Sequence, residues 1–176
     1  MKHLLLTTIA AVLLVGCGLG VNKELSVALK SSNVDPDRIF LLVSAGSDVN
    51  GLDDFNREPL IFELIKGIAD SDKPENKLKV LDIFISHGLK VNIYNRGRLG
   101  LSGEPITPLH YLLYISSIAR TSRNIAALEA AAIKLIENGA DVNKRNPDYN
   151  TPLGYHSSYG FPESRITRTV RRYGGR

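Results

Sequence analysis

The residues of this chain that could carry out chemistry are few, and their spacing is not that of a catalytic centre. His156 is followed by Ser157 and Ser158, a local cluster that could supply a general base and a nucleophile. No Gly-x-Ser-x-Gly turn surrounds this cluster and no acidic residue lies close to it in sequence, so the groups that activate such a serine are missing. No pair of histidines or carboxylates shows metal-site spacing. We therefore expect no enzyme, no metal and no cofactor.

Two other histidines are expected to stabilise the fold. His110 ends the segment Thr107-Pro108-Leu109-His110, where its ring can bond the Thr107 hydroxyl and neighbouring backbone. His87 precedes Gly88 at the expected end of a helix, where a histidine can bond the last carbonyl groups.

The single cysteine, Cys17, follows an N-terminus with the layout of a secretory signal: a basic head at residues 1–3 and an uncharged apolar run at 4–15. This run is shorter than the about 20 residues that a membrane-spanning helix needs. Leu14-Val15-Gly16-Cys17 resembles the lipobox of bacterial lipoproteins, which implies that residues 1–16 are removed and that Cys17 is acylated. Gly18 stands where that family's inner-membrane retention signal has Asp, which implies the periplasmic face of the outer membrane. An ordinary signal with an incidental cysteine is the alternative.

The two halves of the chain have opposite charge. Residues 21–95 hold 12 acidic against 9 basic residues, a net charge of −3, whereas residues 96–176 hold 6 against 12, a net charge of +6. This asymmetry favours an acidic partner for the second half. Export argues against a nucleic acid.

Three segments of the chain follow one pattern of helix, glycine stop, extended turn and proline start. An apolar run at helical spacing leads into each of the turns 45–50, 87–92 and 138–143, and a proline follows each turn. Glycine after a helix adopts positive φ, and proline at the first helical position loses no hydrogen bond. The pattern predicts antiparallel helix pairs, with Asp35 as the N-cap of one outer helix and residues 165–173 as the last helix.

These motifs resemble ankyrin repeats, because Gly139-Ala140-Asp141-Val142-Asn143 and Thr107-Pro108-Leu109-His110 match the two signature segments of that family. The resemblance implies an all-α fold: an ankyrin-repeat solenoid of about four helix pairs with short β-turn fingers. The repeats fall at about 22–50, 51–92, 93–143 and 144–175, after a short tether at 17–21. Glycine-to-glycine periods of 42 and 51 exceed the family's, which is about 33. Residues 96–104 account for part of the excess and predict one extended finger.

The resemblance also implies a binding face, formed by the finger tips and the exposed side of the inner helices. Aromatic residues and arginine are enriched at interface hot spots. We expect a protein partner to contact Leu52, Asp54, Phe55 and Arg57 in the first finger; Tyr94, Arg96, Arg98, Leu99 and Leu101 in the second; Arg145, Asp148 and Tyr149 in the last; and Tyr114 and Tyr159 on inner helices. For Leu99 and Leu101, the alternative to a partner contact is a flexible or locally packed loop.

The expected last helix has an apolar stripe of Ile166, Val170 and Tyr173 surrounded by arginines. A polar terminal cap explains this pattern, and contact with an acidic partner or anionic lipid is the alternative.

Small exported repeat lipoproteins resemble immunity proteins that protect a bacterium from periplasm-active toxins, including phospholipases delivered by type VI secretion. We therefore expect a lipid-anchored module that binds a toxin or effector protein, with no small-molecule substrate. The alternative is an envelope-maintenance lipoprotein that contacts anionic lipid or peptidoglycan through its basic C-terminal helix.

Overall fold

The computed structural model describes residues 18–97, 99 and 103–176. Over these residues the fold is all-α, as predicted. The expected signal segment, Cys17, Arg98 and Leu101 lie outside the described residues. The described helices are α2 (Gly18–Leu29), α3 (Pro36–Ser44), α4 (Leu60–Asp70), α5 (Pro74–Ser86), α6 (Pro108–Ile118), α7 (Ser122–Glu137), α8 (Pro152–Ser158) and α9 (Arg165–Arg172).

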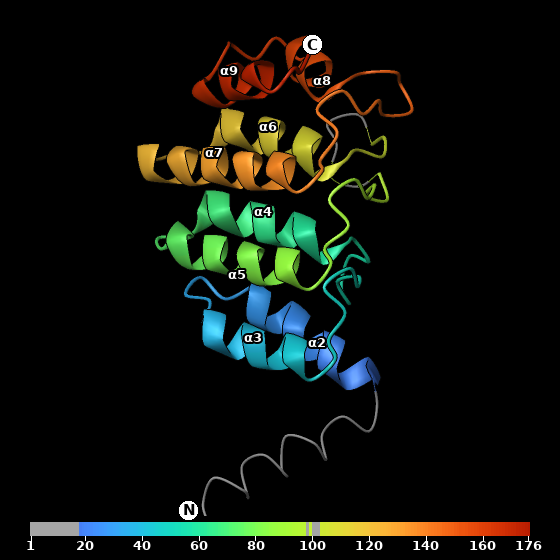
Figure 1. Ribbon diagram of the computed structural model, residues 1–176, viewed down its shortest axis with the longest axis vertical. Helices are drawn as coiled ribbons and strands as arrows, with labels where there is room; N and C mark the ends of the chain where they lie inside the picture. Colours follow the sequence, from blue (N-terminus) through green and yellow to red (C-terminus); the bar gives the residue numbers. More distant parts are fainter. Residues whose placement is uncertain (1–17, 98, 100–102) are drawn as a thin grey trace, which may run out of the picture.

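The helices form a stack of two layers (Figure 1). One layer contains α2, α4, α6 and α8, and the other contains α3, α5, α7 and α9; each helix packs on its neighbours in its own layer. The core lies between the layers along the whole stack, with fully buried side chains such as Leu29, Ile39, Leu64, Phe84 and Leu135. Because each pair buries its apolar face against the next pair, no pair is complete without a neighbour. The long loops between pairs lie along one side of the stack (Figure 1).

The helix boundaries follow the signals in the sequence. The Asp35 side chain accepts a hydrogen bond from the Asp37 amide and caps α3, as predicted. Gly46, Gly88 and Gly139 stop their helices at φ values of 103°, 81° and 91°, also as predicted. Pro59 behaves differently, because it is extended (ψ 138°) and α4 begins one residue later. Helix α2 begins at Gly18, so the described part of the expected tether, residues 18–21, has helical backbone.

The short β fingers are a wrong prediction for the part of the chain that is described. The only strand-like pairing there is an isolated antiparallel bridge between Leu52 and Pro59. In the described residues, isolated backbone hydrogen bonds and side chains close the loops in place of a strand ladder. We refer to the loops 51–59, 93–107 and 144–151 as the first, second and third finger loops.

Four asparagines make one repeated contact at the helix stops of the stack, which we call the asparagine clamp. The Oδ1 atoms of Asn22, Asn50, Asn92 and Asn143 accept hydrogen bonds from the amides of Asp48, Lys90, Asp141 and Arg176, respectively, at 2.7–3.0 Å. Each of these amides lies two residues after a positive-φ glycine. In the last three clamps, the asparagine Nδ2 also donates to the carbonyl of that glycine. The clamps therefore fix the position of each helix stop relative to the preceding loop.

No helix in the described part of the chain combines the length and the apolar character needed to cross a membrane.

Candidate partner-binding surface

An equivalent polar residue closes the base of each finger loop. Asp53, Asn95 and Asn146 are all buried, and the backbone N–H of each donates across its loop, to the carbonyls of Glu58, Ile106 and Asn150. Each side chain also accepts backbone N–H groups within its own loop. The loop tips are therefore carried on closed turns rather than on free chain.

Asp53 is the most strongly held of the three. Its Oδ2 accepts from Ser26 Oγ (2.6 Å) and pairs with Lys30 Nζ (2.7 Å), and its Oδ1 accepts from the Phe55 and Asn56 amides. Burial raises the pKa of this carboxyl, but the bonds from Lys30, Ser26 and the two amides outweigh burial and lower the pKa to about 2. Asp53 thus ties the first finger loop to α2 as an ionised group at neutral pH.

The tip of the first finger loop presents a bare aromatic ring. Phe55 is 91% exposed, and the Lys30 ammonium lies 5.0 Å from the centre of its ring. Asp54 and Arg57 are also exposed, and Arg57 has a φ of 61°, in the left-handed region that non-glycine residues rarely adopt. Leu52 is half-buried in its bridge with Pro59. Three of the four residues expected here are therefore accessible to a partner.

The second finger loop is tied to both neighbouring loops. The Tyr94 hydroxyl donates to the Arg145 carbonyl of the third loop (2.6 Å), and the Arg96 amide donates to Glu58 Oε2 at the end of the first loop (2.8 Å). The Arg96 side chain is exposed, whereas Leu99 is half-buried and packs against the core. Packing of Leu99 agrees with the alternative of a locally packed loop for that residue.

The described residues on either side of the insertion in the second finger loop are in contact. A Cβ added to Gly97 would lie 2.3 Å from the Gly103 carbonyl oxygen, so the two glycines are in backbone contact. Below them, Asn95 and Ile106 exchange two hydrogen bonds. The inserted residues are therefore added to a turn that is complete without them.

The third finger loop repeats the aromatic tip of the first. Tyr149 is 77% exposed and has a φ of 63°, and its carbonyl accepts a hydrogen bond from the Arg145 guanidinium (3.3 Å). Asp148, beside it, is exposed. The two exposed tip rings, Phe55 and Tyr149, thus belong to the first and the last finger loop.

Tyr114 on α6 and Tyr159 at the C-terminal end of α8 are parts of aromatic clusters. Tyr114 is half-buried between Tyr111 and Phe161, with ring centres 6.2 and 6.1 Å away. Tyr159 is 38% exposed and packs edge-on against Tyr155. The half-buried Phe161 extends the cluster, and the sequence analysis missed it because Phe161 lies in the α8–α9 link, outside any recognised helix or finger.

The histidines have the structural contacts expected of them. His110 Nδ1 lies 2.8 Å from Thr107 Oγ1, and its Nε2 lies 3.0 Å from the Asn150 carbonyl. Since a carbonyl only accepts, Nε2 carries the proton and Nδ1 accepts from the Thr107 hydroxyl. Burial lowers the pKa of His110. His87 Nδ1 donates to the Ile83 carbonyl at the end of α5 (2.8 Å).

His156 does not form a site with its neighbours in sequence. Its Nε2 lies 3.0 Å from Ser117 Oγ on α6, and the ring packs against Phe161 with centres 5.4 Å apart. Burial and the positive charge of Arg171 lower the pKa of this imidazole. The contact ties α8 to α6, and Ser117 gave no signal in the sequence because the two residues are far apart in the chain.

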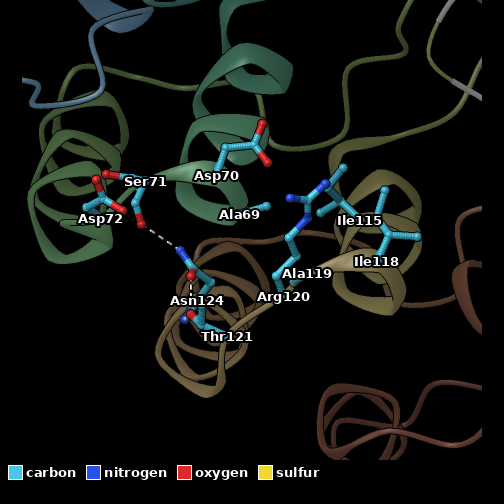
Figure 2. A pocket seen from close by; sticks show the side chains of 10 residues that line it. All are labelled: Ala69, Asp70, Ser71, Asp72, Ile115, Ile118, Ala119, Arg120, Thr121 and Asn124. Carbon is cyan, nitrogen blue, oxygen red and sulfur yellow. Dashed lines mark hydrogen bonds between the residues drawn. The ribbon is translucent and has the colours of Figure 1, made fainter.

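A hollow lies at the C-terminal ends of α4 and α6 (Figure 2). This end pocket has a volume of about 560 Å³. Figure 2 shows the Arg120 side chain extending from the α6–α7 link towards Asp70 on α4, with Ile115 and Ile118 along one wall. Asn124 closes the floor by donating to the Ser71 carbonyl (2.8 Å). The pocket offers both charged groups and an apolar wall.

A smaller pocket, which we call the finger pocket, lies beneath the first and second finger loops. Its volume is about 140 Å³, and Glu58, Phe62, Glu63, Leu99 and Tyr111 are among its lining residues. Together with the end pocket, it places a hollow at each end of the α4–α6 face.

Among the described residues, no three His, Cys, Asp or Glu side chains are placed to hold a metal ion. No protein family model matches this chain, and neither does any curated protein.

Proposed function

We propose that this protein is a membrane-anchored periplasmic module built of ankyrin repeats, which binds and inhibits an antibacterial toxin such as a type VI phospholipase effector. The observation that carries the proposal is the pair of bare aromatic tips, Phe55 at 91% and Tyr149 at 77% exposure, on loops held closed at their bases. Large apolar rings on a pre-organised surface bind a protein with little loss of entropy.

The stack of helix pairs supports the ankyrin assignment. Positive-φ glycines follow α3, α5 and α7, prolines stand at or just before the first residue of α4, α6 and α8, and in every asparagine clamp the bonded amide lies two residues after a positive-φ glycine. A stack of this kind presents its loops along one side, where a partner can contact several of them at once.

The anchoring rests on the lipobox-like segment that ends at Cys17. Because α2 begins at the next residue, acyl chains on Cys17 would hold the first helix pair close to the membrane. Replacing Cys17 with Ser removes the residue that would be acylated. The variant should therefore leave the membrane fraction, since stable anchoring needs more than one acyl chain. Retention of the Cys17→Ser protein in membranes washed with high salt would contradict this part of the proposal.

Inhibition of a toxin requires that the finger loops reach its active site. We expect deletion of residues 98–102, which joins Gly97 to Gly103, to leave the helical spectrum nearly unchanged because those glycines already touch, and to lower the melting temperature only modestly through the loss of Leu99 from the edge of the core. The same deletion should weaken binding to a toxin encoded beside this protein's gene by at least about 30-fold, the effect of losing a hot spot of about 2 kcal/mol. Unchanged affinity after the deletion would remove the second finger loop from the binding face.

The contacts of α9 favour a terminal cap over a lipid-binding helix. Arg165 pairs with Glu129 and Arg171 pairs with Glu163, while Arg172 donates to Thr169 Oγ1 (2.8 Å). Arginines engaged within the fold are poorly placed to neutralise anionic lipid.

A further inference from the structure

The finger pocket contains a buried carboxylate oxygen without a partner. Glu58 is 2% exposed; its Oε2 accepts the Arg96 amide, but its Oε1 has no hydrogen-bond partner among the described residues. A buried polar atom left unpaired costs about 1–3 kcal/mol, and Glu58 lines this pocket, so the pocket favours an occupant that donates hydrogen bonds.

The other charged groups of the pocket leave it acidic. Glu63, on α4, adds a second, half-buried carboxylate to the lining. Asp53 also lines the pocket, but its oxygens are occupied by Lys30, Ser26 and backbone amides. The one lining cation in the described residues, Lys66, directs its ammonium to Asp70 Oδ2 (3.1 Å). The charged side chains of the described lining are therefore mostly acidic.

The remaining walls are aromatic. Phe62 and Tyr111 line the pocket with ring centres 5.5 Å apart. Burial raises the pKa of the Tyr111 hydroxyl, and the nearby negative charges of Glu63, Asp70 and Glu58 raise it further. Aromatic rings beside carboxylates attract organic cations.

We infer that the finger pocket binds a guanidinium group, presented by an arginine side chain of the protein partner. A guanidinium donates parallel N–H bonds to carboxylates, which suits a pocket lined by Glu58 and Glu63. The volume of about 140 Å³ corresponds to roughly four or five water-sized groups, and a guanidinium has four non-hydrogen atoms. This inference rests on the proposed function for the source of the arginine, but its test needs no partner.

The test titrates the full chain in detergent with N-acetylarginine amide and follows the Tyr111 ring signals by NMR. N-acetyllysine amide serves as a second cation and N-acetylcitrulline amide as a neutral isostere. We expect saturable shifts with the arginine probe and at least about tenfold weaker binding of the other two. No saturable shift with arginine, or equal binding of all three probes, overturns the inference and leaves the proposed function to its own test.

Variants identify the groups responsible. Glu58→Gln should abolish binding of the arginine probe, and Glu63→Gln should weaken it several-fold without disturbing a buried group. Glu24→Gln, at an exposed carboxylate of α2, is the matched control and should change nothing. Lys66→Met should strengthen binding, because it removes the cation of the lining; weaker binding in this variant would indicate an anion site and overturn the inference.

Discussion

Replacing Asn92 with Ala tests whether the asparagine clamps couple successive helix pairs of the stack. Asn92 donates to the Gly139 carbonyl and accepts the Asp141 amide, both at 2.8 Å, across 47 and 49 residues of sequence. Each bond contributes roughly 0.5–1.5 kcal/mol net. The residue is half-buried, so we expect the free energy of unfolding to fall by about 2 kcal/mol.

The measurement is urea unfolding of the mature protein, followed by its helical circular dichroism. Because Asn92 joins the turn after α5 to the turn after α7 near the middle of the stack, we expect the transition to broaden as well as shift. Asn138→Ala is the control, since Asn138 Nδ2 makes a single bond to Lys134 within its own helix end. If the free energy of unfolding falls equally in the two variants, or falls by less than about 0.5 kcal/mol in Asn92→Ala, the clamps do not couple successive helix pairs.

Three further predictions concern stability. The lowered pKa of Asp53 means that this carboxylate contributes about 2 kcal/mol to the free energy of unfolding above pH 3.8, and that this contribution is lost as pH falls towards 2. Asp53→Ala should therefore lower the free energy of unfolding by about 2 kcal/mol at pH 7 and flatten its dependence on acid pH. The lowered pKa values of His110 and His156 mean that the unfolded chain takes up protons first, so stability should fall as pH drops below 6.5, and a His110→Gln, His156→Gln protein should lack this slope in thermal melts from pH 7 to 5. Gly139→Val should cost on the order of 1 kcal/mol or more in urea unfolding, because the Cβ meets open space and only the positive φ opposes it; an unchanged midpoint would contradict the assigned backbone.

Local signals in the sequence predicted the helices well. The cap at Asp35, the glycine stops and the contact of His110 with Thr107 are short-range features, in which the bonded groups lie within three residues of each other. Periodicity and capping rules therefore located them directly.

Long-range contacts were not predictable in the same way. The asparagine clamps were visible only as the last letter of a repeated motif, and their partners lie 26 to 49 residues away. The pairing of His156 with Ser117 and the burial of Glu58 likewise depend on how the layers stack. The fingers were predicted as β turns, but side chains such as Asp53 supply the bonds that a strand ladder would have made.

The most direct test of the proposed function is calorimetric titration of this protein with a toxin encoded by the neighbouring gene. We predict tight binding by the native chain, a loss of at least about 30-fold when Phe55 and Tyr149 are both changed to Ser, and no loss for Leu41→Ser, an exposed apolar residue of α3 away from the finger loops. Absence of binding by the native chain, or equal affinities for all three proteins, would contradict the assignment of the finger tips as the binding face.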